Sequence, residues 1–126
     1  MYKYCILLSG PTISCDYDLV DGFKKYGHVI INPNNHLVEK IISIKRIDVL
    51  ILEHHIELSV EMAIVQKLKS RKPGLPIFLV DTRANRSIIT AAFLYGVTDA
   101  FIKPYKVNLM IERINALMLS DRNHIC

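Results

Sequence analysis

Four polar residues that could share one site stand at the ends of short apolar runs in this sequence: Ser9, Glu53, Asp81 and Lys103. If the runs are parallel strands, their carboxyl ends meet at one edge of the sheet, and we expect the four side chains to converge there. Two carboxylates and one ammonium group leave a local charge of about −1, so Lys103 would neutralise one carboxylate. A structural salt bridge that closes the sheet is the simpler interpretation.

The elements that must position these residues follow from the hydrophobic pattern. Strands are predicted at residues 3–9, 28–32, 48–53, 76–81 and 99–103. Segments of helical period lie at residues 16–26, 37–44, 58–70, 85–95 and 107–119. Apolar strands that alternate with amphipathic helices are typical of a parallel sheet with helices on both faces. The sequence therefore predicts an α/β fold, a three-layer (βα)5 doubly wound parallel sheet of five strands.

Composition limits the possible classes. The chain has 126 residues, a length that fits one domain but not two. Of these residues, 51% are hydrophobic, which is enough to build the core of that domain. Its net charge of +4 comes from lysines and arginines spread over all segments, so no nucleic-acid groove is predicted. No apolar run suits a membrane span or a signal peptide. We expect a domain at residues 1–119, with 120–126 as a polar tail or the start of a linker.

The cysteines point to a reducing compartment. Cys5, Cys15 and Cys126 are odd in number and lack the spacing of metal ligands. We expect them to be reduced thiols of a cytoplasmic protein, and Cys5 to lie in the core.

Nearly the whole chain, from Tyr4 to about Leu119, resembles the receiver domain of response regulators, the CheY-like, flavodoxin-like signalling module of phosphorelays. Residues 48–53, Asp-Val-Leu-Ile-Leu-Glu, are similar to the family's third strand, which ends in the phosphoacceptor, and residues 75–80 to its fourth strand. Residues 92–105 resemble the alanine, glycine, acidic and Lys-Pro-aromatic signature around the fifth strand. The resemblance implies the strand order 2-1-3-4-5.

The resemblance also implies roles for single residues. Lys103 falls on the lysine that contacts the phosphoryl group, and Pro104 on the proline whose preceding peptide is usually cis. The acceptor position, normally aspartate, is Glu53, and a glutamate there often resembles a weak mimic of the phosphorylated state. The acidic pair that binds the divalent cation falls on Ser9 and Gly10, so magnesium loses its main ligands.

Two switch positions depart from the family as well. The switch hydroxyl falls on Asp81, where a carboxylate would repel a phosphoryl group unless a bulge brings Thr82 into its place. The switch aromatic falls on Ala100, while Phe101 is expected to point to the opposite face and into the core. We therefore expect a degenerate pseudo-receiver that is not an enzyme and has no catalytic residue, metal or cofactor. Something other than aspartyl phosphorylation would fix or control its conformation.

Partners are implied by the face that receivers use for dimers and output domains, the fourth helix, fifth strand and fifth helix. Its exposed candidates are Arg83, Arg86, Tyr95, Asp99, Lys106 and Glu112. An ordinary solvated surface is the alternative. The resemblance implies a protein partner, an output domain or a homodimer, with no direct contact to nucleic acid or membrane. A DNA-binding domain that follows in a longer protein rests on family habit alone.

A small-molecule or nucleotide site is the second hypothesis. Residues 9–14, Ser-Gly-Pro-Thr-Ile-Ser, form a hydroxyl-rich loop before a helix, where backbone amides can hold a phosphate. Against this, Pro11 removes a donor, and Ser14 or Asp16 is expected to cap the helix.

A metal or enzyme site is the third hypothesis. Glu53, His54 and His55 with Glu57 are rich in potential ligands, but their spacing matches no zinc motif. A loop that exposes two histidines is the simpler explanation.

Overall fold

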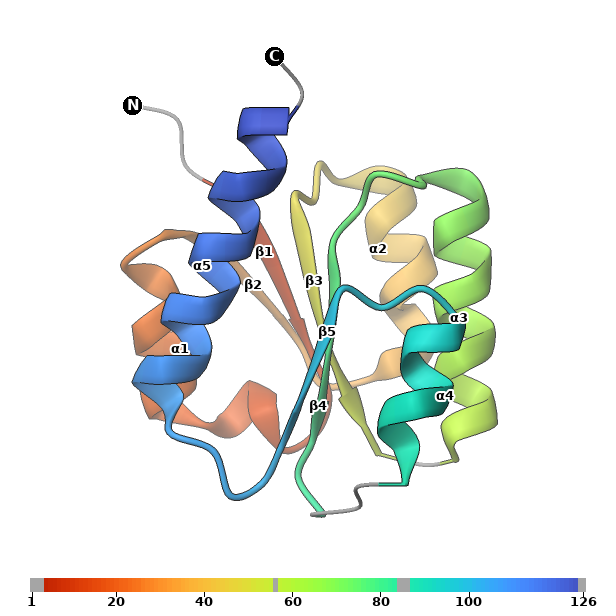
Figure 1. Cartoon of the computed structure of the whole chain (residues 1–126), viewed down its shortest axis with the longest axis horizontal. Helices are drawn as coiled ribbons and strands as arrows, with labels where there is room; N and C mark the ends of the chain where they lie inside the picture. Colours follow the sequence, from red (N-terminus) through yellow and green to blue (C-terminus); the bar gives the residue numbers. More distant parts are fainter. Residues whose placement is uncertain (1–3, 56, 84–86, 125–126) are drawn as a thin grey trace.

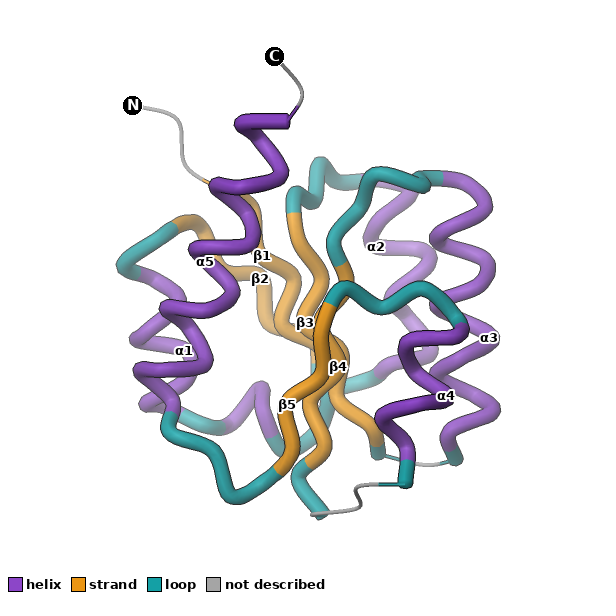
Figure 2. The backbone as a smooth tube through the Cα atoms, in the orientation of Figure 1, coloured by secondary structure: helices purple, strands orange, loops and turns teal. Residues whose placement is uncertain are grey.

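The computed structural model describes residues 4–55, 57–83 and 87–124. Within them, five strands form one parallel sheet: β1 (Tyr4–Ser9), β2 (Gly27–Asn32), β3 (Val49–His54), β4 (Ile77–Asp81) and β5 (Asp99–Ile102). Their order is β2-β1-β3-β4-β5, which confirms the prediction (Figures 1 and 2). The central strands β3 and β4 are buried along their whole length because their runs are apolar on both faces.

Helices cover both faces of the sheet. They are α1 (Tyr17–Lys24), α2 (Val38–Ile44), α3 (Leu58–Arg71), α4 (Ile88–Leu94) and α5 (Val107–His124), with short 3-10 turns η1 (Ile13–Cys15) and η2 (Asn35–Leu37). In Figure 1, α1 and α5 lie on one side of the sheet and α2, α3 and α4 on the other. We call these sides the α1/α5 face and the α2/α3/α4 face.

The hydrophobic core has two halves, one on each face. Leu50 and Leu52 of β3 belong to the half under α2, α3 and α4, whereas Val49 and Ile51 belong to the half under α1 and α5. This division follows from the period of two along a strand, because successive side chains point to opposite faces. The same alternation decides which polar residues can meet at the carboxyl edge.

Local sequence signals explain where α1 begins and which of its side chains are buried. Asp16 caps α1, since its Oδ1 accepts a hydrogen bond from the Leu19 amide at 3.2 Å. Leu19, Val20 and Phe23 form the buried stripe of that helix, as their spacing indicates.

Two predicted helix boundaries differ from the structure by more than two residues. Helix α4 begins at Ile88, and Asn85, the predicted start, lies outside the described residues. Helix α5 continues to His124 instead of ending at Leu119, so residues 120–124 are not an unpatterned tail. These residues carry no apolar signal, but polar side chains also extend a helix that is already formed. Of the helices in the described ranges, none combines the length and the hydropathy that a membrane crossing requires.

Candidate functional site

Glu53 lies at the centre of the carboxyl edge and has an exposed fraction of 0%. Its Oε1 accepts hydrogen bonds from the backbone amides of Thr12 at 2.9 Å and Ile13 at 2.8 Å. Its Oε2 accepts one from the Thr82 hydroxyl at 3.3 Å. Donors from the loop between β1 and α1 and from the end of β4 therefore satisfy a carboxylate that is buried.

Gly10 lies directly against this glutamate. Its φ of +145° is a conformation that favours glycine, and its amide donates to Asn32 O at 2.9 Å. A Cβ atom added at Gly10 would overlap both Cβ and Oε1 of Glu53. No side chain fits at position 10 while the loop and Glu53 keep these places.

The four polar residues expected to converge do not form one cluster. The Ser9 hydroxyl donates to Asn35 Oδ1 at 2.7 Å and accepts from Asn32 Nδ2 at 3.0 Å, in a network that ties β1 to β2 and η2. Ser9 shares the α2/α3/α4 face with Leu7, whereas Glu53 shares the opposite face with Ile51. The expectation failed because residues that end neighbouring strands need not point to the same face.

Asp81 does not occupy the switch-hydroxyl place. It is buried, and its Oδ1 accepts from the backbone amide of Arg83 at 3.1 Å. Thr82, the next residue, brings the hydroxyl to Glu53 instead. The structure thus realises the alternative in which Thr82, one residue beyond the ungapped match, faces the acceptor position.

Lys103 does not neutralise a carboxylate. Its side chain is exposed, and within the described part of the chain it forms no ion pair or side-chain hydrogen bond. Its backbone amide donates to Asp81 O at 3.0 Å. The peptide bond between Lys103 and Pro104 is cis, the isomer that the resemblance implies. Glu53 does not need the ammonium group, because amide donors already hold its charge.

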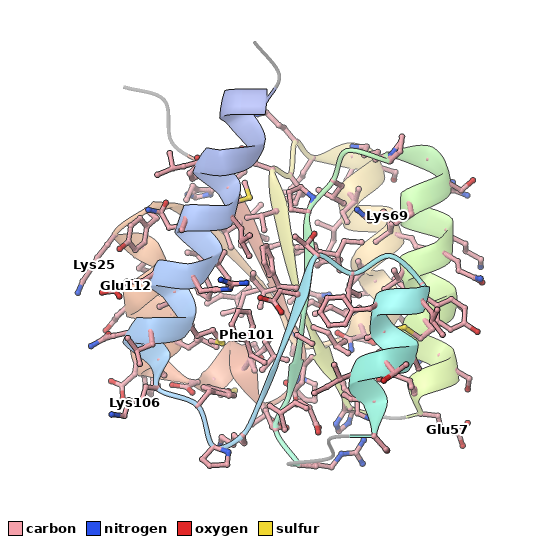
Figure 3. All side chains as sticks on the ribbon, in the orientation of Figure 1. Lys25, Glu57, Lys69, Phe101, Lys106 and Glu112 are labelled. Carbon is pink, nitrogen blue, oxygen red and sulfur yellow. The ribbon has the colours of Figure 1, made fainter. Side chains whose placement is uncertain are left out.

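The aromatic residues near the site pack into the core under α1 and α5. Phe101, labelled in Figure 3, lies against Phe78 with ring centroids 6.3 Å apart. Ala100 packs against the other half of the core. Phe101 therefore points into the core, as expected. The Tyr105 hydroxyl is buried and has no hydrogen-bond partner among the described residues. Burial, with smaller contributions from the charges of Asp16 and Glu53, raises the pKa of Tyr105 to about 12.

A second polar cluster lies on the α2/α3/α4 face. His54, the last residue of β3, is 5% exposed, and its Nδ1 lies 2.6 Å from Oε1 of the buried Glu61 in α3. Its Nε2 lies 3.4 Å from a terminal nitrogen of Arg83. The simpler explanation, a loop that exposes two histidines, is thus wrong for His54 and holds only for His55, which is exposed.

Sequence reasoning missed Glu61, although a signal was present. Glu61 stands three, four and seven residues before Ile64, Val65 and Leu68, so it lies on the buried stripe of α3. A charged residue on such a stripe requires a buried partner. The partner is His54, one residue after the end of the predicted strand.

The divalent-cation site that the resemblance implies does not fit these residues. Position 10 has no room for an acid, and the Glu53 oxygens are held by amides and a hydroxyl. Across the described ranges, no group of three or more histidine, cysteine or acidic residues could hold a metal ion. The loop at residues 9–14 is also poorly suited to a bound phosphate, because its Thr12 and Ile13 amides already bind Glu53.

The predicted interaction residues separate into two groups. Arg83, Tyr95 and Asp99 come from the β4–α4 loop, the end of α4 and β5, and Asp99 accepts from Arg113 Nε at 3.1 Å. Lys106 and Glu112 instead line hollows between α1 and α5, together with Lys25 (Figure 3). Arg86 lies outside the described residues.

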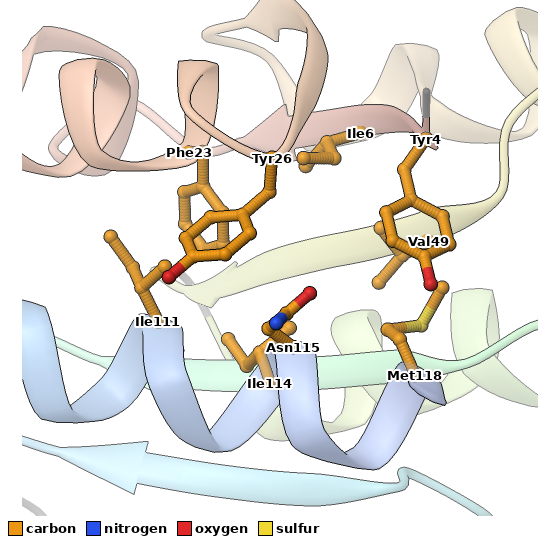
Figure 4. A pocket seen from close by; sticks show the side chains of 9 residues that line it. All are labelled: Tyr4, Ile6, Phe23, Tyr26, Val49, Ile111, Ile114, Asn115 and Met118. Atoms are coloured by element: carbon orange, nitrogen blue, oxygen red, sulfur yellow. The ribbon is translucent and has the colours of Figure 1, made fainter. Parts of the chain in front are cut away.

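A cavity near the opposite edge of the sheet is not a ligand site. It lies between α1, α5 and the first residues of β1 and β3, and its walls are mainly apolar (Figure 4). Its volume of about 10 Å³ is no more than roughly one water molecule needs.

Solved structures show what this architecture is similar to. A response-regulator receiver domain protein (CheY-like) from Methanospirillum hungatei has a TM-score of 0.84 at 12% identity, over 98% of this chain and 99% of that one. An orphan response regulator of H. pylori has a TM-score of 0.79 at 16% identity, over 91% and 96%. NtrX from Brucella abortus has a TM-score of 0.80 at 15% identity, over 98% of this chain and 28% of that one. Comparison of the sequence with family models and with curated proteins gives no match. The chain therefore has the flavodoxin-like receiver fold.

Proposed function

We propose, from the receiver fold that the chain shares with these response regulators, that it is a signal-transduction domain that is not phosphorylated in the conventional way. It would act through protein–protein contacts in the cytoplasm and would not be an enzyme. The observation that carries this proposal is the state of Glu53, whose carboxylate is buried and held by two backbone amides and a hydroxyl.

An acceptor carboxylate must present a free oxygen to an incoming phosphoryl group. Here Oε1 would first have to leave the Thr12 and Ile13 amides, which would leave the buried Ile13 amide without its partner. The other oxygen, Oε2, would have to leave the Thr82 hydroxyl. The missing acidic pair removes the cation that would compensate the charge of the phosphoryl group. The Glu53 carboxylate thus takes the place of a bound anion and holds the β1–α1 loop through its Thr12 and Ile13 amides.

Contacts with other proteins would use the α4 and β5 side. Phe93, Leu94 and Tyr95 are consecutive and exposed at the end of α4, beside the half-buried edge strand β5. An exposed apolar patch of this kind is typical of an interaction site. A homodimer or an output domain are the occupants that the receiver fold suggests.

A longer protein is part of the proposal. The NtrX chain is far longer than the part that matches here, which supports a receiver unit joined to an output domain. Since α5 continues to His124, a linker would begin beyond that helix.

The test is the response to magnesium and beryllofluoride, followed by amide NMR shifts. We expect no specific shifts in the natural sequence or in a Glu53→Asp variant, because neither has the acidic pair. A Glu57→Asp variant is the matched control, since Glu57 is exposed before α3. A receiver domain that keeps its acidic pair is the positive control. Saturable shifts at Glu53, Thr82 and Lys103 in the natural sequence would show that a phosphate switch survives.

A further inference from the structure

The contact between His54 and Glu61 fixes which imidazole nitrogen carries the proton. Glu61 is 0% exposed, and its Oε1 accepts from the His55 amide at 3.1 Å in addition to facing His54 Nδ1. A carboxylate accepts hydrogen bonds only, so His54 Nδ1 is the donor. In the neutral ring, Nε2 then has a free lone pair.

Arg83 uses that lone pair. A guanidinium is always charged and only donates, so the 3.4 Å approach of Arg83 to Nε2 requires the neutral imidazole. If Nε2 takes up a proton, two donors and two positive charges face each other at the same place. The contact then changes from attraction to repulsion.

Other charged groups lie around His54. Glu61 faces it from α3, and Asp81 is its cross-strand neighbour in β4 on the same face. One oxygen of Glu61, Oε2, is buried without a hydrogen-bond partner among the described residues, so a cationic imidazole would compensate its charge. Arg83 faces it from the β4–α4 loop, His55 is exposed, and Glu53 points to the other face.

Arg83 links this cluster to α4. It follows Thr82 in the loop between β4 and α4, and its backbone amide donates to Asp81 Oδ1. Neighbouring residues of the loop are thus anchored to neighbouring residues of β3 on opposite faces, Thr82 to Glu53 and Arg83 to His54.

We propose that His54 is a proton-sensitive contact of Arg83: the neutral imidazole accepts from Arg83, whereas the protonated one repels it and thereby shifts the start of α4. The input would be a proton, and the output a change beside the apolar patch at the end of α4. The proposal concerns a site separate from Glu53 and stands whether or not the chain is phosphorylated.

The experiment is an NMR titration of the whole chain from pH 8 to pH 5, an interval that contains the ordinary histidine pKa of about 6.5. The imidazole signals of His54 and His55 are followed beside the amide signals of Arg83, Ser87 and Ile88. We expect the three amides to shift with one midpoint, shared with the His54 ring. The proposal is wrong if the three amide signals do not shift, or if their midpoint matches that of the His55 ring. It is also wrong if they shift while the His54 ring signals stay constant.

Two variants complete the test. A His55→Gln variant should keep the full response, because that side chain is exposed. An Arg83→Gln variant changes an exposed side chain and should leave the fold intact. We expect its Ser87 and Ile88 amides to lie at their low-pH positions already at pH 8 and to lose their titration. If Arg83→Gln keeps the titration of these amides, Arg83 is not the connection and the proposal is wrong.

Discussion

Glu53 differs from aspartate by one methylene, and that methylene decides where its carboxylate lies. The longer side chain reaches the Thr12 and Ile13 amides of the β1–α1 loop. Gly10 makes this possible, since the loop backbone passes so close to Glu53 that a Cβ atom has no room. The two residues therefore form one packing unit, in which the glycine is as necessary as the glutamate.

Replacing Gly10 by alanine tests this unit. The added methyl group meets Glu53 and must also adopt a φ of +145°, so overpacking and backbone strain act together. We expect Gly10→Ala to lower the free energy of unfolding by about 2–3 kcal/mol in urea denaturation.

Gly74→Ala is the control for that variant. A Cβ at Gly74 meets nothing within 4 Å, so we expect a change of less than about 1 kcal/mol. Equal losses in the two variants would show that the loop is not packed on Glu53.

At the scale of elements, α4 is a short helix that buries few of its side chains. It has seven residues, and Ile88 and Ala92 are its buried side chains. Leu94 is 81% exposed, next to Phe93 and Tyr95. Little of this helix holds it to the sheet, so the β4–α4 loop and any bound partner would strongly influence its position.

If a second copy covers this patch, a charge at its centre should prevent association. We expect sedimentation at high protein concentration to show a dimer that Leu94→Glu weakens at least tenfold, because the new carboxylate would lose water in the interface.

The matched control is Leu109→Glu, at a side chain that is 59% exposed at the start of α5 beside α1. It should leave association unchanged. A strict monomer, or equal effects of the two changes, would contradict a dimer through α4 and β5.

At the scale of the whole molecule, the burial of one tyrosine hydroxyl makes stability depend on pH in the alkaline range. The pKa of Tyr105 rises from 10.0 to about 12 on folding, chiefly because the side chain is buried. Between these values the unfolded chain loses the proton and the folded chain keeps it, so the free energy of unfolding falls as pH rises. Below pH 10 this contribution is fully present.

Urea denaturation between pH 8 and pH 12 measures the effect. We expect a shallower alkaline fall in Tyr105→Phe than in the natural sequence. At pH 8 the stability should change by less than about 1 kcal/mol, because the hydroxyl that is removed has no partner among the described residues. Tyr17→Phe, at a side chain that is 83% exposed, should keep the natural slope. Identical slopes in all three proteins would contradict the assigned environment of Tyr105.

The global features were predictable because many residues contribute to each of them. Alternating apolar runs and helical stripes indicated the sheet, its order followed from the resemblance, and Asp16 marked the start of α1. The site was less predictable, because a one-residue difference at a strand end moves a side chain to the other face. For this reason Thr82, and not Asp81, places its side chain next to Glu53. His54, predicted to follow the strand, is a buried residue of β3.

The close packing of Gly10 on Glu53 also limits how an acidic pair could be built at this site. The overlap involves Cβ of Glu53, an atom that aspartate shares, so a change to aspartate at position 53 does not make room for an acid at position 10. An acid introduced first at position 10 meets the existing glutamate. The loop backbone must therefore move before acids fit at both positions. Gly10 is thus a barrier in sequence space that exchanging Glu53 for aspartate does not remove.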